Sequence, residues 1–472
     1  MSRRDRSKRR KSRRRLLWAA GGVVAVGAAV GAGVLGPDLL ASEPAVKVAG
    51  VLSLPGIDPG WPAADVVLSA ARADGDPVDD VAGRIDVLAG AAELGGHVGV
   101  AVAELGSGEV VYESNVSDGF IPASTMKILT SVAALDVLGP DHQFVTGVVM
   151  GDGGSAEAAD ITLVGGGDPM LASSADAATV PGAASLDQLA AATAEVLAAE
   201  GIDAVRLSFD DALFTGPAID PDWRSTYVPN GVVAPVSALS VDGGRRDPGL
   251  RQRADDPAQA AAQVFAGALE DEGIEILDDP RRASAADDAP ELVAASSPPL
   301  STIVEYVMRT SDNDAAEHLH RHVALGSGRD GSSAEAAAAT EDVLAGLGIE
   351  LAGVDIRDGS GLARGNSVTA GALVAALEVA ADVDRPDLRP VLGGLPVAGF
   401  TGTLAERAAD GGAGYVRAKT GTLTGVHSLA GIAAGADGPA YAFAVLADDA
   451  SDALAARAAL DRLAAGLVRS SP

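Results

Sequence analysis

The chain of 472 residues is 47% hydrophobic and 21% charged, so it is long and apolar enough for two or three packed domains and is unlike a disordered or fibrous chain. It contains no cysteine, which excludes disulfides, thiol catalysis and cysteine-based metal sites. A formal net charge of -30 would repel a nucleic acid backbone, so we expect no DNA or RNA partner and interpret the acidity as a solvated surface.

The first 36 residues predict a membrane segment. Residues 3–15 are almost wholly basic, whereas residues 16–36 are uncharged and apolar or glycine. As a helix, residues 16–36 would span about 30 Å, enough for the core of a bilayer. Because positive charge precedes this segment, we expect a cytoplasmic tail, a membrane anchor and an extracytoplasmic body. A cleaved signal peptide is the alternative, and it exports the body equally.

A proline- and alanine-rich linker is expected over residues 37–84, followed by the folded body. Apolar residues alternate over His97–Glu104, a glycine-rich turn follows, and Val110–Glu113 returns, which predicts a hairpin. From Ser124 to about Leu138 the apolar residues have the spacing of a buried helix.

The rest of the body predicts two domains. Residues 145–297 contain strand-like segments at Asp160–Val164 and Ala204–Asp210 and have the size of an inserted domain. Residues 85–144 and 298–472 are then expected to form one catalytic domain. Its other predicted helices cover residues 301–308, 314–325, 333–347, 370–381 and 453–468, and its late strands cover residues 414–420, 426–434 and 440–447. One sheet built from both chain ends, with helices between, predicts an α/β sandwich.

Two lysines in the body mark candidate chemistry. The chain has 30 arginines but five lysines, and Lys127 and Lys419 are the two within the predicted body. Arginine cannot lose its proton in a protein, whereas a buried lysine can. This usage suggests that each of the two lysines has a role in which arginine could not replace it.

Three short motifs carry these lysines, namely Ser124-Thr125-Met126-Lys127, Ser311-Asp312-Asn313 and Lys419-Thr420-Gly421. A spacing of three places Ser124 and Lys127 on one helix face, one turn apart. A serine hydroxyl needs an adjacent base to become a good nucleophile, and Lys127 can be that base only when it is neutral. Burial and a second cation, for which Lys419 is the candidate, would both lower the pKa of Lys127.

The second motif supplies polar groups to the same reaction. The hydroxyl of Ser311 can relay a proton towards a leaving amine, and the amide of Asn313 can hold both Lys127 and a substrate carbonyl. Asparagine occurs four times in the chain, so its presence in the motif is not compositional noise.

The third motif lies on a predicted strand. Lys419 and Thr420 can bind a terminal carboxylate, and Gly421 would leave room for substrate along the strand edge. The backbone N–H of Thr422 can join that of Ser124 as an oxyanion hole. Each motif alone is weak, but the three together indicate a serine acyl-enzyme.

A trio of this kind is typical of class A β-lactamases and penicillin-binding proteins. Over about residues 85–468 the chain resembles the low-molecular-mass class C penicillin-binding proteins, the D-alanyl-D-alanine carboxypeptidase/endopeptidase family. Residues 163–169, 358–362 and 404–422 also match that family, as do residues 209–214 followed by Trp223 and Tyr227. Ala363, where the family usually has serine, and Met170, where it usually has threonine, are departures.

The resemblance implies a serine β-lactamase/DD-peptidase-like sandwich that cleaves D-alanyl-D-alanine bonds of peptidoglycan stem peptides through an acyl-serine. It implies the roles given above for Ser124, Lys127 and the other motif residues, acylation by β-lactams, and no cofactor. It also suggests that Asp168 contacts a substrate side chain, although a turn-forming aspartate is the alternative. The balance of carboxypeptidase and endopeptidase activity and the oligomeric state are left open.

Two other functions compete with this interpretation. A β-lactamase or esterase on the same fold is disfavoured, because no Glu-x-x-Leu-Asn segment is present and Ser124 and Ser311 lie 187 positions apart. A non-catalytic peptidoglycan-binding protein is disfavoured by the intact serine and lysines. His318 and His322 share a helix face, but we expect histidines on an exposed helix and no metal site.

Overall fold

The computed structural model describes residues 81–468, apart from residues 156–157, 408–410 and 436–437. The predicted tail, the predicted anchor and nearly all of the predicted linker therefore lie outside the described residues. None of the helices within the described part has the length and apolar character that a membrane span needs.

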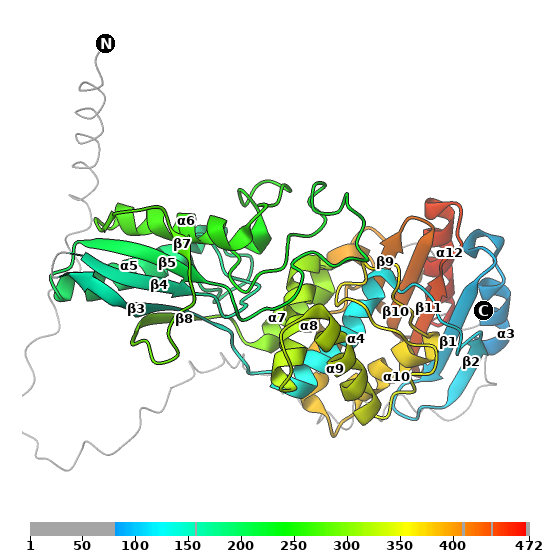
Figure 1. Cartoon of the computed structure of the whole chain (residues 1–472). Coiled ribbons are helices and arrows are strands. Elements are labelled where there is room, and N and C mark those ends of the chain that lie inside the picture. Colours follow the sequence, from blue (N-terminus) through cyan, green and yellow to red (C-terminus); the bar gives the residue numbers. More distant parts are fainter. Residues whose placement is uncertain (1–80, 156–157, 408–410, 436–437, 469–472) are drawn as a thin grey trace, which may run out of the picture. The chain divides into compact units, whose positions relative to one another are not determined.

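One sheet of the described structure joins the two ends of the body (Figure 1). Its antiparallel strands run in the order β2-β1-β11-β10-β9, so β9 lies at an edge. The strands are β1 (Val98–Glu104), β2 (Val110–Ser114), β9 (Val416–Leu423), β10 (Val426–Ala434) and β11 (Ala440–Ala447). The predicted hairpin and the predicted adjacency of the late strands are confirmed.

Alternating side chains give this sheet two different faces. Val100 and Val102 pack into a core with α3 (Val81–Ala89) and α12 (Ala453–Gly466). Ala101 and Ala103 face a second core, built mainly from helices. Because successive strand residues point to opposite faces, one strand serves both cores.

The helices between the chain ends form the second core. They are α4 (Met126–Leu138), α7 (Leu300–Thr310), α8 (Asn313–Gly326), α9 (Ser333–Gly346) and α10 (Ala370–Ala381), close to the predicted ranges. Helix α4 has ten buried residues, as expected for a helix surrounded by others. Shorter helices connect the elements: η2 (Ala92–Leu94), η3 (Ala123–Thr125), η4 (Ala175–Ala177), η5 (Asp242–Gly244), η6 (Pro386–Leu388), α11 (Pro390–Gly393) and η7 (Gly402–Leu404).

A second sheet is built from the region predicted as an insertion. Its strands are β3 (Val145–Ser155), β4 (Ala158–Val164), β5 (Ala204–Asp210), β6 (Glu275–Ile276), β7 (Arg281–Arg282) and β8 (Glu291–Ser296), in the order β6-β5-β4-β3-β8 with β7 paired to β5. Helix α5 (Leu186–Ala199) connects the parallel strands β4 and β5, and α6 (Pro257–Asp271) contributes to the same apolar core. The α/β fold class is confirmed, whereas the division into domains stays a prediction.

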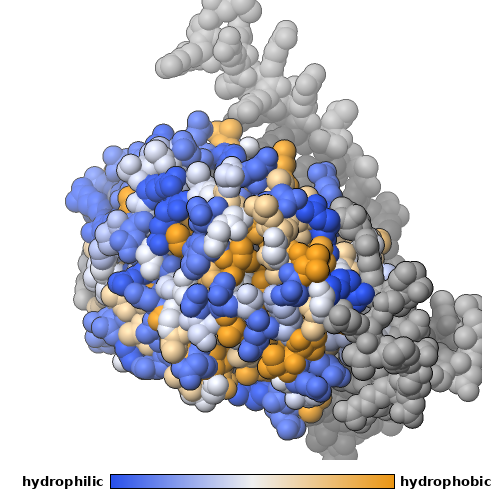
Figure 2. All heavy atoms as spheres, turned by 90° about the vertical axis from the view of Figure 1, so that its right-hand side faces the viewer, coloured by the Kyte–Doolittle hydropathy of each residue, from blue (hydrophilic) through white to orange (hydrophobic). Residues whose placement is uncertain are grey.

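The surface near the first sheet is mainly polar. Figure 2 shows this end of the molecule, where hydrophilic residues surround separate hydrophobic patches. Val87, Val110 and Leu454, on α3, β2 and α12, are among the exposed apolar residues. This distribution fits the expected solvated surface.

Candidate active site

Ser124 and Lys127 lie at the start of the central helix. Ser124 belongs to the single turn η3, and α4 begins two residues later, so the predicted helix starts with a tighter turn. Lys127 Nζ lies 3.1 Å from Ser124 Oγ. The same amine donates to Asn313 Oδ1 at 2.8 Å and to the Ser360 carbonyl at 2.7 Å. Lys127 is fully buried, whereas Ser124 is partly exposed.

Burial favours the neutral form of the Lys127 amine. It lowers the pKa of Lys127 from 10.5 to about 8, although nearby carboxylates, Asp358 and Glu317 foremost, act in the opposite direction. Burial also lowers the pKa of Lys419 well below its usual value, and the charge of Lys127 adds to this effect. A lysine with a pKa near neutrality can accept a proton at physiological pH.

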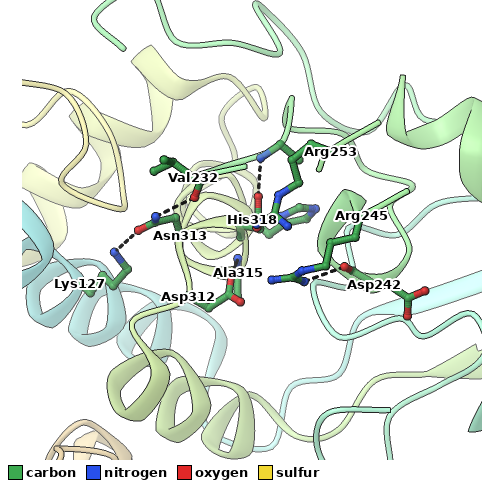
Figure 3. Close-up of polar contacts among 11 residues, drawn as sticks. Lys127, Val232, Asp242, Arg245, Arg253, Asp312, Asn313, Ala315 and His318 are labelled. Atoms are coloured by element: carbon green, nitrogen blue, oxygen red, sulfur yellow. Dashed lines mark hydrogen bonds and ion pairs between the residues drawn. The ribbon is translucent and has the colours of Figure 1, made fainter. Parts of the chain in front are cut away.

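The second motif lies where α7 ends and α8 begins. Ser311 follows α7 with φ 62° and ψ 34°, a left-handed conformation that few non-glycine residues adopt. Asp312 caps α8 by accepting from the Ala315 N–H at 3.0 Å. Asn313 is the first residue of α8, and its Nδ2 donates to the Val232 carbonyl at 2.9 Å, as Figure 3 shows. This bond orients the amide so that its oxygen faces Lys127.

The third motif lies within β9, at the edge of the sheet. Lys419 Nζ donates to Ser311 Oγ at 2.8 Å and to the Thr420 carbonyl at 2.9 Å. Thr420 is half-buried and Thr422 is exposed. A Cβ at Gly421 would lie 2.0 Å from Ser428 Oγ and 2.7 Å from the Pro122 carbonyl. The glycine thus allows η3 to pack closely on the sheet, which differs from the predicted role of leaving room for substrate.

The comparisons with known proteins agree with this geometry. A model of the D-Ala-D-Ala carboxypeptidase 3 (S13) family matches residues 81–254 and 245–467. The chain belongs to this family. A carboxypeptidase of Mycobacterium tuberculosis is 36% identical over 359 residues, 74% of this chain and 75% of the relative. A D-alanyl-D-alanine carboxypeptidase of Actinomadura sp. is 31% identical over 451 residues, 78% of this chain and 81% of the relative.

Solved structures show the same fold. Penicillin binding protein 4 (dacB) from Haemophilus influenzae matches with a TM-score of 0.67 at 22% identity, over 81% of this chain and 98% of that structure. The predicted family, fold and serine-type D-Ala-D-Ala carboxypeptidase activity are therefore confirmed.

Two residues that contact the motifs of the carboxypeptidase were missed by the sequence reasoning. The Ser360 carbonyl accepts from Lys127, 233 positions away. Thr403 lies in η7, and its hydroxyl accepts from that of Thr420 at 2.9 Å. Both lie in segments that match the family, but no residue spacing assigns them a contact.

Asp168 does not join this cluster. It is 2% exposed, its Oδ1 accepts from the Met170 N–H at 2.7 Å, and its Oδ2 has no hydrogen-bond partner among the described residues. Burial raises the pKa of Asp168 to about 7. The geometry is that of the turn-forming alternative, and a contact with a substrate side chain stays a prediction.

The histidines of α8 are buried, so the expectation of an exposed helix is wrong. His318 and His322 are 4% and 6% exposed, and their rings contact the backbone carbonyls of Ser237 and Gly167. Helices α4, α7 and α9 pack around α8, which leaves little of its surface in solvent. Among the described residues, no group of three or more His, Asp or Glu side chains is placed to hold a metal.

Gly361 is expected to be essential for placing the nucleophile of the carboxypeptidase. It has φ 82°, and a Cβ would lie 1.8 Å from the Ala123 carbonyl, next to Ser124. Gly361→Ala should therefore destabilise the protein and slow acylation of Ser124 strongly. Gly348→Ala is the matched control, because Gly348 has φ 81° with no atom near its Cβ position, so it should cost only about 1–2 kcal/mol of backbone strain. Thermal unfolding and labelling by fluorescent penicillin measure both effects, and equal labelling of the two variants would contradict the argument.

Proposed function

We propose that this carboxypeptidase forms an acyl-enzyme on Ser124, with Lys127 as the general base. The observation that carries the proposal is the fully buried amine 3.1 Å from the serine hydroxyl. Lys127 takes the hydroxyl proton as Ser124 Oγ attacks the carbonyl carbon of the penultimate D-alanine. The C–N bond then breaks, and the terminal D-alanine leaves once its amine is protonated. Water hydrolyses the ester afterwards and restores Ser124.

The remaining motif residues bind the substrate and the charges that develop. Ser311, whose Oγ lies 2.8 Å from Lys419 Nζ, passes a proton to the leaving amine. Lys419 and Thr420 bind the terminal carboxylate, and Asn313 holds the substrate carbonyl. The N–H groups of Ser124 and Thr422 stabilise the oxyanion, and losing one such donor typically slows turnover by about 10²–10³-fold.

The pH dependence of acylation follows from the proposed base. Since only the neutral amine accepts a proton, the rate should rise by about tenfold for each pH unit below the Lys127 pKa of about 8 and then level off. Because the pKa of Lys419 lies well below its usual value, Lys419 loses its charge at a lower pH than an exposed lysine does, and binding of a carboxylate-bearing substrate should weaken as the pH rises. Stopped-flow acylation by a β-lactam, with its concentration varied at each pH, separates the acylation rate from binding. An acylation rate at saturating β-lactam that falls between mildly acidic pH and pH 8 would exclude Lys127 as base.

We propose peptidoglycan stem peptides as the substrate. Incubation with purified muropeptides, followed by mass spectrometry, separates release of terminal D-alanine from cleavage of crosslinked dimers. The Ser124→Ala variant should yield neither product. Fast turnover of penicillin without muropeptide cleavage would instead favour the β-lactamase alternative.

We also propose that residues 16–36 anchor the enzyme with its body outside the cytoplasm, and that residues 145–297 form an inserted domain. The basic residues before the apolar segment support the first statement. The second is supported by a sheet and an apolar core formed within the inserted residues. Recovery of the full chain in the membrane fraction, with protease access to the body from outside, tests the topology.

A further inference from the structure

The backbone of Ser360 is held from both sides. Its carbonyl accepts from Lys127 Nζ at 2.7 Å, and its N–H donates to Glu317 Oε1 at 2.8 Å. The preceding carbonyl, that of Gly359, accepts from the Thr130 hydroxyl at 2.8 Å. The loop that carries Ser360 is therefore tied to α4 and α8, the helices that carry Lys127 and Asn313.

The contacts of Lys127 determine where its lone pair points. A neutral lysine amine has two N–H groups and one lone pair. Of its three contacts, the Asn313 Oδ1 and the Ser360 carbonyl can only accept, so they take both hydrogens. The lone pair is left facing Ser124, whose hydroxyl can donate. The Ser360 carbonyl is thus one of two groups that aim the base at the nucleophile.

Asp358 holds this loop in shape. Its side chain is fully buried, and each carboxylate oxygen accepts from a backbone N–H of the loop: Oδ1 from Gly361 at 2.8 Å and Oδ2 from Ala363 at 2.7 Å. Oδ1 also accepts from Asn366 Nδ2 at 2.7 Å. These bonds join Asp358, which precedes Ser360, to residues that follow it, and they fix the direction of the Ser360 carbonyl.

The Ser360 hydroxyl also donates to Asp358 Oδ2, at 3.4 Å, and a further donor comes from the region predicted as an insertion. Trp223 Nε1 donates to Asp358 Oδ2 at 2.8 Å, across 135 positions of sequence. The Trp223 ring is 7% exposed and belongs to an apolar cluster with Leu362 and Ala363. The indole therefore both packs on the loop and bonds to its central carboxylate.

We propose that Trp223 and Asp358 are positioning residues that fix the Ser360 carbonyl, so that the Lys127 lone pair faces Ser124. The inference rests on the proposed role of Lys127 as base. It gives the region of residues 145–297 a part in acylation, because that region supplies the indole. Trp223 and Asp358 are both buried, so we place their effect in the loop rather than in contact with substrate.

Trp223→Phe tests the proposal by removing the N–H while keeping an aromatic ring. A hydrogen bond to a carboxylate is strong enough that its loss should slow acylation at saturating β-lactam by about tenfold. The non-covalent dissociation constant should stay near the wild-type value. The midpoint of the pH–rate profile should move to lower pH, since a misplaced carbonyl stabilises the Lys127 ammonium less. The charged groups that face Lys127 (Asp312, Asp314, Glu317, Asp358 and Lys419) are unchanged in this variant.

Tyr227→Phe is the matched control, because Tyr227 packs in the same apolar cluster as Trp223. This variant should be acylated on Ser124 at the wild-type rate. If Trp223→Phe does not fold, Thr130→Val provides a second test, because it removes the hydrogen bond from α4 to the Gly359 carbonyl of the same loop. The acylation rate and the midpoint of the pH–rate profile are measured in the same way. A folded variant with wild-type rate and midpoint would overturn the positioning role. Failure of the proposed function has a different signature. In that case the Ser124→Ala variant would be labelled by fluorescent penicillin as strongly as the wild-type protein.

Discussion

Replacing Lys127 by arginine is expected to slow acylation of Ser124 by about 10³-fold or more while the protein stays folded. Arginine keeps the positive charge but cannot give up its proton, so it cannot activate the hydroxyl 3.1 Å away. The charge-dependent contacts with Asn313 and Ser360 can still form. The second-order rate constant for labelling by fluorescent penicillin measures the loss.

A neutral variant separates the charge from the proton transfer. Lys127→Met fits the buried site without an amine, and it should lose acylation to the same extent. Circular dichroism and thermal unfolding establish that both variants are folded. Labelling of the folded arginine variant at the wild-type rate would refute the assignment of Lys127 as base.

Replacing Arg253 by methionine is expected to lower the free energy of unfolding by about 3–5 kcal/mol. Arg253 Nη2 lies 2.5 Å from Asp314 Oδ2, and the two side chains are 4% and 5% exposed. Asp314 also accepts from the Ala234 N–H at 2.6 Å. Removing the guanidinium leaves the buried Asp314 carboxylate without the opposite charge that it contacts. An uncompensated buried charge destabilises the folded state strongly. Denaturant unfolding at alkaline pH, where the Asp314 carboxyl is ionised, measures the difference.

Two further variants and the pH dependence test this explanation. Arg253→Met combined with Asp314→Asn should recover much of the loss, because no unpaired charge remains. Arg462→Met, which breaks the exposed Arg462–Glu93 pair at 3.2 Å, should cost no more than about 1 kcal/mol. Burial already raises the pKa of Asp314 to about 7 while Arg253 is present, and removing the guanidinium should raise it further. The folded single variant therefore takes up a proton as the pH falls from alkaline values towards 7, and its deficit should shrink over that range. A deficit that is equal at alkaline and acidic pH would contradict an unpaired charge as the cause.

The sequence was sufficient for the strands of the first sheet and for the proximity of Ser124 and Lys127. The apolar residues over His97–Glu104 predicted a strand, and the structure has β1 at Val98–Glu104, where it is buried on both faces. The spacing of Ser124 and Lys127 is a local property of a helix, so their proximity follows without knowledge of the rest of the fold. The family resemblance depended on the same local motifs.

The remaining environment of the site depended on tertiary packing. Ser360 contacts Lys127 across 233 positions, Trp223 contacts Asp358 across 135, and Glu317 contacts Ser360 across 43. No periodicity encodes such contacts. His318 was expected on an exposed face, but burial of α8 depends on the helices packed around it rather than on its own sequence. Residue types and local spacing thus determined which groups can react. The three-dimensional packing decided which carbonyl aims the lysine, how far burial lowers its pKa, and which glycine is required by a neighbouring backbone, because each depends on atoms distant in the chain.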